Sequence, residues 1–169
     1  MVISGPFAVS QSRPDTIGYS RWAPAARLKG LLETLQAHDV SLLVDTRLQP
    51  CSSQLKGRYG PKDWTLQSGA AGLAHHLGRI GVEYLWLSEL GNPQRHDPDM
   101  AVLRAHLEDG GMRWPVNRGL ELLRGRIEGD DVVCLLCTCR DAATCHRTVI
   151  GEAVRARYFG ERLDVRSLT

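Results

Sequence analysis

A run of fourteen residues near the C-terminal end gathers most of the reactive side chains of the chain. From Cys134 to Arg147 it contains four of the five cysteines, a histidine and two arginines. An apolar strand, expected over residues 132–136, leads into a short polar loop, and the loop opens a helix whose apolar residues keep helical spacing. Cys145 and His146 are therefore predicted at a helix N-terminus together with Arg147. Unpaired N–H groups and the helix dipole attract anions there and lower the pKa of a thiol.

One interpretation of this run is a thiol enzyme. Cys145 would be the nucleophile, its thiolate stabilised by the helix dipole and by Arg147, while His146 would accept or donate a proton. A related interpretation places the nucleophile at Cys137 or Cys139, at the end of the strand, as in rhodanese sulfurtransferases and cysteine phosphatases. The phosphatase loop puts its arginine six positions after the cysteine, whereas Cys139 reaches Cys145 there and Arg147 comes two positions later. This second version therefore stays an analogy.

A metal site is another interpretation of the same cysteines. Thiolate and imidazole ligands suit zinc or an iron–sulfur cluster. Residues 134 and 137 point to opposite faces of a straight strand, so both cannot hold one ion. Cys134 is interpreted as a small core residue. The ligand set that remains feasible, if a metal is present, is Cys137, Cys139, Cys145 and His146.

A third interpretation is a binding domain without covalent chemistry. The helix N-terminus, Arg147, Arg47 and a basic loop with aromatic residues suit a phosphate and a stacked base. The leading prediction is an anionic ligand: a phosphorylated nucleoside or other nucleotide, or a segment of single-stranded nucleic acid. Lys56 and Arg58 are predicted binding residues in the loop at 49–68, which is long enough to act as a lid.

The elements that must position these residues alternate between strands and helices. Strands with intervening helices predict an α/β fold with a mainly parallel sheet and helices on both faces, a Rossmann-like arrangement of three layers. Strands are expected at residues 16–19, 41–44, 82–87, 132–137 and 163–165. Helices are expected from Pro24 and over about residues 70–80, 97–110, 115–127 and 145–158.

In such a sheet the binding crevice lies beyond the carboxyl ends of the strands. The carboxylates at this edge have two open roles: they contact a sugar or base, or they hold the arginines in place. A purely structural ion pair between Asp45 and Arg47 is a third possibility. The residues predicted to meet at the edge with the Cys-His-Arg helix are Tyr19, Ser20, Asp45, Arg47, Glu89, Cys137 and Cys139.

The length and composition of the chain limit the classes of protein to which it can belong. The chain has 169 residues, 43% of them hydrophobic, which is enough for one core and a single domain over residues 14–169. Residues 1–13 lack periodicity and are interpreted as a flexible N-terminal arm. The formal charge of +2 does not demand a nucleic-acid or membrane partner. Clustered cysteines, with no signal-peptide pattern and no apolar run of about twenty residues, predict a cytoplasmic protein with reduced thiols, a metal or redox chemistry and no membrane partner.

Four ordered motifs resemble the bacterial and archaeal family called domain of unknown function 488. The hallmark is a Leu-Leu-Cys strand end, here reaching Cys137, followed after a short loop by Cys-His-Arg, here starting at Cys145. The stretches at residues 16–20, 44–47 and 81–91 stand in the order that this family shows. The likeness covers roughly residues 14 to 158, and four motifs in order make it specific.

This resemblance implies little about activity, because the family is named for lacking an assigned function. Two features depart from the family pattern. The segment at 50–68 reads differently from the Arg- and Phe-containing stretch of relatives. Cys134 and Cys139 are additions to the usual pair Cys137 and Cys145. The site residues therefore have to be argued from their own chemistry.

Overall fold

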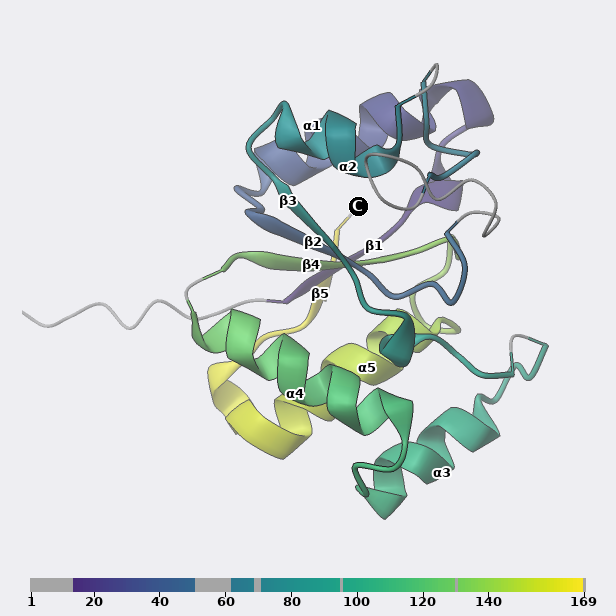
Figure 1. The fold of residues 1–169 in the computed structure, drawn as a ribbon, viewed down its shortest axis with the longest axis vertical. Coiled ribbons are helices and arrows are strands. Elements are labelled where there is room, and N and C mark those ends of the chain that lie inside the picture. Colours follow the sequence, from purple (N-terminus) through teal and green to yellow (C-terminus); the bar gives the residue numbers. More distant parts are fainter. Residues whose placement is uncertain (1–13, 51–61, 69–70, 95, 130, 169) are drawn as a thin grey trace, which may run out of the picture.

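The computed structural model describes residues 14–50, 62–68, 71–94, 96–129 and 131–168. The predicted N-terminal arm at 1–13 and the predicted binding residues Lys56 and Arg58 lie outside these ranges. The described residues form a five-stranded sheet between two layers of helices (Figure 1). Every pairing between neighbouring strands is parallel. The predicted α/β fold with helices on both faces of a parallel sheet is confirmed.

The sheet has the strand order β3-β2-β4-β1-β5. The central strand β4 is buried at every residue, as expected of a parallel strand covered on both faces. The last strand is expected at 163–165 but begins three residues later, at Arg166, because Leu163 packs in the core before the chain reaches the edge of β1. The strands are β1 (Asp15–Gly18), β2 (Leu42–Asp45), β3 (Glu83–Trp86), β4 (Val133–Cys137) and β5 (Arg166–Ser167).

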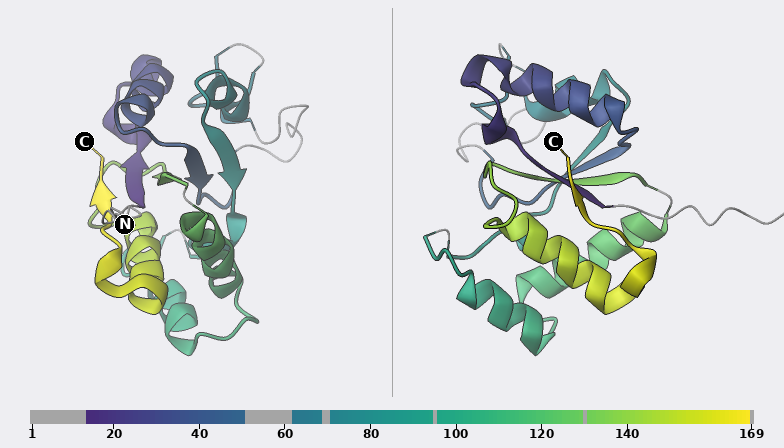
Figure 2. Two further views of the ribbon diagram at one scale, coloured as in Figure 1. Left: turned by 90° about the vertical axis from the view of Figure 1, so that its left-hand side faces the viewer. Right: turned by 180° about the vertical axis from the view of Figure 1, so that it is seen from behind.

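Of the α-helices in the described residues, those after β1 and β2 cover one face of the sheet, and the others lie on the opposite side (Figure 2). Pro24 opens a 3-10 turn, and the α-helix begins three residues later. Pro115 stands at the start of α4, where its missing N–H costs no hydrogen bond. No helix in the described ranges is long and apolar enough to cross a membrane. The first two helices are α1 (Arg27–Ala37) and α2 (Leu73–Gly78); the other three are α3 (Ala101–Asp109), α4 (Pro115–Glu128) and α5 (His146–Val154).

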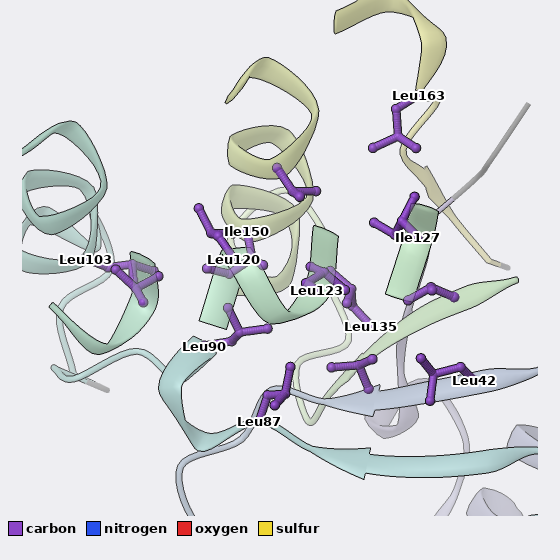
Figure 3. Packing of buried hydrophobic residues seen from close by; sticks show 14 of the residues in the cluster. Leu42, Leu87, Leu90, Leu103, Leu120, Leu123, Ile127, Leu135, Ile150 and Leu163 are labelled. Atoms are coloured by element: carbon purple, nitrogen blue, oxygen red, sulfur yellow. The ribbon is translucent and has the colours of Figure 1, made fainter. Parts of the chain in front are cut away.

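Alternate residues of the central strands pack in two separate hydrophobic cores, one on each face of the sheet. Leu42 and Leu135 point toward α4 and α5 and pack with Leu120 and Ile150 (Figure 3). The residues next to them point the other way, so Cys134 is fully buried in the core under α1 and α2. Cys134 is thus a core residue, on the opposite face from Cys137.

The topology creates a crevice at the carboxyl end of β4. β1 and β2 flank β4, and the helices that follow them cover one face of the sheet, whereas α5, which follows β4, covers the other (Figure 1). Connections that leave neighbouring strands toward opposite faces open a crevice between them, where ligands of α/β proteins bind. Cys137 is the last residue of β4 and lies at this point.

Candidate functional site

A cleft of about 1390 Å³ opens at the carboxyl edge of the sheet. Cys137, Cys139 and His146 lie on its wall, at the end of β4 and the start of α5. Glu89 and Trp64 line other parts of the same cleft. The cleft therefore brings the cysteine-rich run and the loops after β2 and β3 to one place.

Three cysteine sulfurs form a cluster beside this cleft. The Sγ atoms of Cys137, Cys139 and Cys145 all lie within 4.8 Å of one another, and those of Cys137 and Cys139 are 3.7 Å apart. The loop after β4 folds back to bring them together, with the Cys145 N–H donating to the Ala142 carbonyl oxygen. Cys139 is exposed, whereas Cys137 and Cys145 are buried. A tetrahedral zinc with Zn–S bonds of about 2.3 Å holds its sulfurs about 3.8 Å apart, close to this spacing.

His146 faces the sulfur cluster with an unprotonated ring nitrogen. Its Nε2 lies 3.1 Å from the carbonyl oxygen and 3.0 Å from the hydroxyl oxygen of Thr46. The Thr46 hydroxyl donates its own proton to the Leu136 carbonyl oxygen, so both Thr46 oxygens act as acceptors toward Nε2. Nε2 therefore carries the ring proton. The lone pair of Nδ1 lies 3.7 Å from the sulfur of Cys137 and 3.9 Å from that of Cys145.

Protonation within the cluster favours a thiolate at Cys137. Side-chain hydrogen bonding with Cys139 and Cys145 lowers the pKa of Cys137 to about 3. The same interaction with Cys137 raises the pKa of Cys145 and of Cys139, so these two thiols keep their protons. We had expected the helix dipole to make Cys145 the thiolate. The structure differs because side-chain hydrogen bonding with Cys137 and Cys139, together with burial, raises the pKa of Cys145, and these effects outweigh the dipole.

His146 and Cys134 have pKa values shifted by burial. Burial lowers the pKa of His146, which keeps the ring neutral and its Nδ1 lone pair available. Burial also raises the pKa of Cys134 well above its usual range, so this thiol stays protonated in its strand. The neutral imidazole beside Cys137 can act either as a base or as a metal ligand.

Arg147 lies beneath the loop rather than in the cleft. Its side chain is 1% exposed, and its Nη1 donates to the Cys139 carbonyl oxygen at 2.8 Å. A Cβ at Gly18 would come within 1.7 Å of that oxygen and 2.9 Å of Nη1, so the close packing of the loop on β1 requires glycine. Arg147 thus fixes the Cys139 backbone, and it is not placed to cradle an anion in the cleft as a phosphatase arginine would.

The carboxylate of Asp45 holds Arg47 at the end of β2. The guanidinium donates through Nε and Nη2 to the two oxygens of Asp45, at 2.8 and 2.6 Å, and through Nη1 to Asp63. Burial alone would lower the pKa of Arg47, but the hydrogen bonds and charges of Asp45 and Asp63 outweigh it and raise the pKa. Tyr84 donates to Asp45 as well, at 2.7 Å. Three roles were open for Asp45: contact with a ligand, positioning of an arginine, or a structural ion pair. The described contacts show a buried ion pair with Arg47.

The structure divides the predicted site residues into three groups. Tyr19, Arg47, Glu89, Cys137 and His146 line the cleft. A second group lies behind its wall: Asp45, Cys145 and Arg147 are all buried. Ser20 is half-buried and donates its backbone N–H to the Thr138 carbonyl oxygen.

Several residues of the site were not singled out from the sequence. Asp63 comes from a loop sixteen residues beyond Arg47, and nothing in its local pattern indicates that partner. Thr46 orients His146, and its place two residues after the predicted strand at 41–44 could have drawn attention to it. Gly18 has a readable signal, because a glycine within a strand often marks a close approach of backbone.

Comparison with known proteins gives a family and no relative of known activity. A family model described as "Domain of unknown function DUF488" matches residues 27–154, which is most of the chain. No curated protein and no solved structure shows significant similarity to this chain. The match contains the strand end at Cys137 and the Cys-His-Arg start of α5.

Proposed function

We propose, for a chain that belongs to the DUF488 family, that its function depends on a divalent metal ion bound at the carboxyl end of β4. The observation that carries this proposal is the cluster of three sulfurs from Cys137, Cys139 and Cys145, within 4.8 Å of one another. Zinc is the metal that the ligands favour, because thiolate and imidazole groups in tetrahedral arrangement suit it.

The surroundings of His146 support the same proposal. Histidines that bind metals usually donate their second ring N–H to a carbonyl or carboxylate, which fixes the ring and the tautomer. His146 does so through Thr46 and turns Nδ1 toward Cys137 and Cys145. The short spacing of the sulfurs favours one ion over an iron–sulfur cluster, whose several irons would hold the cysteines farther apart.

The ligand at the fourth coordination position would determine whether the metal site is structural or catalytic. His146 Nδ1 lies beside two of the sulfurs but is not within 4.8 Å of all three, so its coordination would need a small rotation or a movement of Cys139. Cys137, Cys139 and His146 all line the cleft. A water or substrate atom from the cleft could therefore occupy this fourth coordination position. Three protein ligands and one open position are the arrangement of a catalytic metal site.

Metal analysis of the purified protein tests this proposal. Expressed without added metal, the parent should hold about one zinc per chain. Cys139→Ser should lose most of it, because a ligand is removed. Cys134→Ser is the matched control: its cysteine lies in the strand core on the opposite face and should leave the metal content unchanged. A parent that is metal-free and does not take up zinc on titration would contradict the proposal.

The cleft also supports a second candidate, the binding of a phosphorylated nucleoside or a nucleic-acid segment. Trp64 lines the cleft with 59% of its surface exposed and could stack on a base. The described cations are few: Arg118 is exposed at the cleft, but Arg47 is already bound by two carboxylates. Nucleotide titration followed by tryptophan fluorescence tests this candidate, with Trp64→Phe as the control. An unchanged signal in the parent would remove it.

Thiol chemistry is the alternative use of the same residues. Cys137 would be the nucleophile, since its pKa is lowered, and His146 would be the neighbouring base. This version competes with metal binding because a coordinated thiolate is not free to attack. If the parent proves metal-free and iodoacetamide labels Cys137 first, thiol chemistry replaces the metal centre.

A further inference from the structure

Arg147 is a buried cation for which the described residues offer no carboxylate. Its side chain is 1% exposed, its Nη1 donates to the neutral carbonyl oxygen of Cys139, and its Nε has no hydrogen-bond partner among the residues that the structure describes. Removing such a charge from water costs several kcal/mol unless an opposite charge compensates. The side chain therefore points to an anionic group in its surroundings.

The other buried charges are already paired. Arg47 binds Asp45 and Asp63, so both carboxylates have their cation. Asp15 binds Arg166 at 3.2 Å. Among the buried charged residues that the structure describes, Arg147 alone has no acidic partner. The cysteines of the cluster are groups beside Arg147 that can become anions, since Arg147 donates to the Cys139 backbone and follows Cys145 by two residues.

The charge of a metal centre at this cluster matches that of Arg147. Three thiolates carry three negative charges and a divalent ion two positive ones, so the bound centre has a net charge of −1. One guanidinium, which stays protonated in proteins, neutralises it. A neutral fourth ligand, such as His146 Nδ1 or water, keeps this balance, whereas a hydroxide or a fourth thiolate would break it.

We infer that Arg147 is the buried counter-ion of a centre made of three thiolates, one divalent ion and a neutral fourth ligand. This inference rests on the proposed metal function and specifies its charge. Arg147 acts as a positioning residue: it touches the Cys139 carbonyl oxygen, not the cleft, and stabilises the fully deprotonated ligand set. The packing against Gly18 keeps the guanidinium in place beneath the loop.

Two substitutions at Arg147 separate its charge from its hydrogen bond. Arg147→Gln keeps a donor for the Cys139 carbonyl oxygen and removes the charge, while Arg147→Lys keeps the charge. Each variant is stripped of metal, and its affinity for zinc is measured by competition with a chromophoric chelator. Cobalt substitution then reports the number of bound thiolates through the intensity of the sulfur-to-cobalt charge-transfer absorption. Ile150→Val, a conservative change in the core beneath α5, controls for a general loss of stability.

We expect Arg147→Gln to bind zinc about 10- to 100-fold more weakly and to show weaker charge-transfer absorption, because one thiolate is no longer stabilised. Arg147→Lys should keep most of the affinity and the three-thiolate spectrum, and Ile150→Val should match the parent in both. A Gln variant equal to the parent would overturn the inference, as would a folded Lys variant that loses the three-thiolate spectrum. If the Gln variant does not fold, the Lys variant decides alone. A parent that binds neither zinc nor cobalt would overturn the metal function itself, and the inference with it.

Discussion

At the cysteine cluster, side-chain hydrogen bonding with Cys137 raises the pKa of Cys139 and of Cys145, so these two thiols hold their protons. In the absence of metal the cluster therefore carries one thiolate near neutral pH. Metal binding removes the remaining two protons, and the lowered pKa of Cys137 makes it the first sulfur available to an incoming ion. The neutral ring of His146 is available in the same range of pH.

The metal-free protein should become less stable as the pH falls, partly through Cys137. Its pKa is about 3 in the folded protein and about 8.5 in the unfolded chain, so the unfolded chain binds one more proton between these values. The free energy of unfolding then rises with pH by at most about 1.4 kcal/mol per pH unit, and this contribution is lost as the pH falls toward 3. Urea unfolding of the parent and of Cys137→Ala at several pH values measures the difference.

The control for this experiment is Cys134→Ala. The pKa of Cys134 is raised by burial, so below about pH 8 its thiol is protonated both in the folded and in the unfolded protein. Its removal should lower the stability by a similar amount at every pH. Equal pH slopes for the parent and for Cys137→Ala would show that Cys137 is not a thiolate in the metal-free protein.

The buried ion pair of Asp45 and Arg47 should contribute strongly to stability. Asp45→Asn removes the charge that compensates the guanidinium at 2.6 Å, and breaking a buried pair in this way costs about 3 to 5 kcal/mol. Chemical denaturation should show this loss. Glu33→Gln is the comparison, because it breaks an exposed pair with Lys29 that should matter little. A small effect at Asp45 would mean that Asp63 alone can hold Arg47.

At the scale of elements, the end of β1 and the loop after β4 must approach closely for the cluster to form. Gly18→Ala would force the Cys139 backbone away, because the new Cβ would lie 1.7 Å from its carbonyl oxygen. We expect lower stability and a clear loss of bound zinc. In Gly125→Ala, on an open face of α4, the Cβ meets nothing, and the change should stabilise the helix by about 1 kcal/mol. Thermal unfolding and metal content of both variants provide the test.

The elements were largely predictable because their signals are local. A few apolar residues in a row predict the buried strand β4, and Pro115 predicts the start of α4. The short edge strand β5 was misplaced, since its position depends on where Leu163 packs and not on its own sequence. The order of the strands in the sheet follows from packing between distant segments, which local patterns do not contain.

The site was predictable in its location and less so in its chemistry. Residues after strand ends were expected at one edge, and Tyr19, Arg47, Glu89 and Cys137 do line one cleft. The protonation of the cysteines depends instead on sulfur positions set by the fold of the loop. The position of Cys145 at a helix N-terminus suggested a thiolate. The sequence does not show the side-chain hydrogen bonding with Cys137 that raises the pKa of Cys145, so this prediction was wrong.

At the scale of the whole molecule, residues beside the cluster contact segments that are far apart in the chain. Thr46 after β2 contacts His146 of α5, and Tyr19 after β1 contacts Thr138 after β4, with the hydroxyl oxygens 3.0 Å apart. An ion at the cluster would therefore hold the carboxyl ends of β1, β2 and β4 together. Metal binding should then be linked to global folding and not only to the order of one loop.

Zinc should accordingly raise the thermal midpoint of the whole domain. An ion that binds the folded protein alone stabilises it by about 2.7 kcal/mol at a free concentration 100 times its dissociation constant, and the midpoint should rise with zinc concentration. Differential scanning calorimetry of metal-free protein with added zinc measures this shift, and a chelator should reverse it. Cys139→Ser should show little or no shift, whereas Cys134→Ser, altered in the opposite core, should shift like the parent. If the parent binds zinc without a change in midpoint, the ion also binds the unfolded chain, and the folded cluster is not the preferred zinc site.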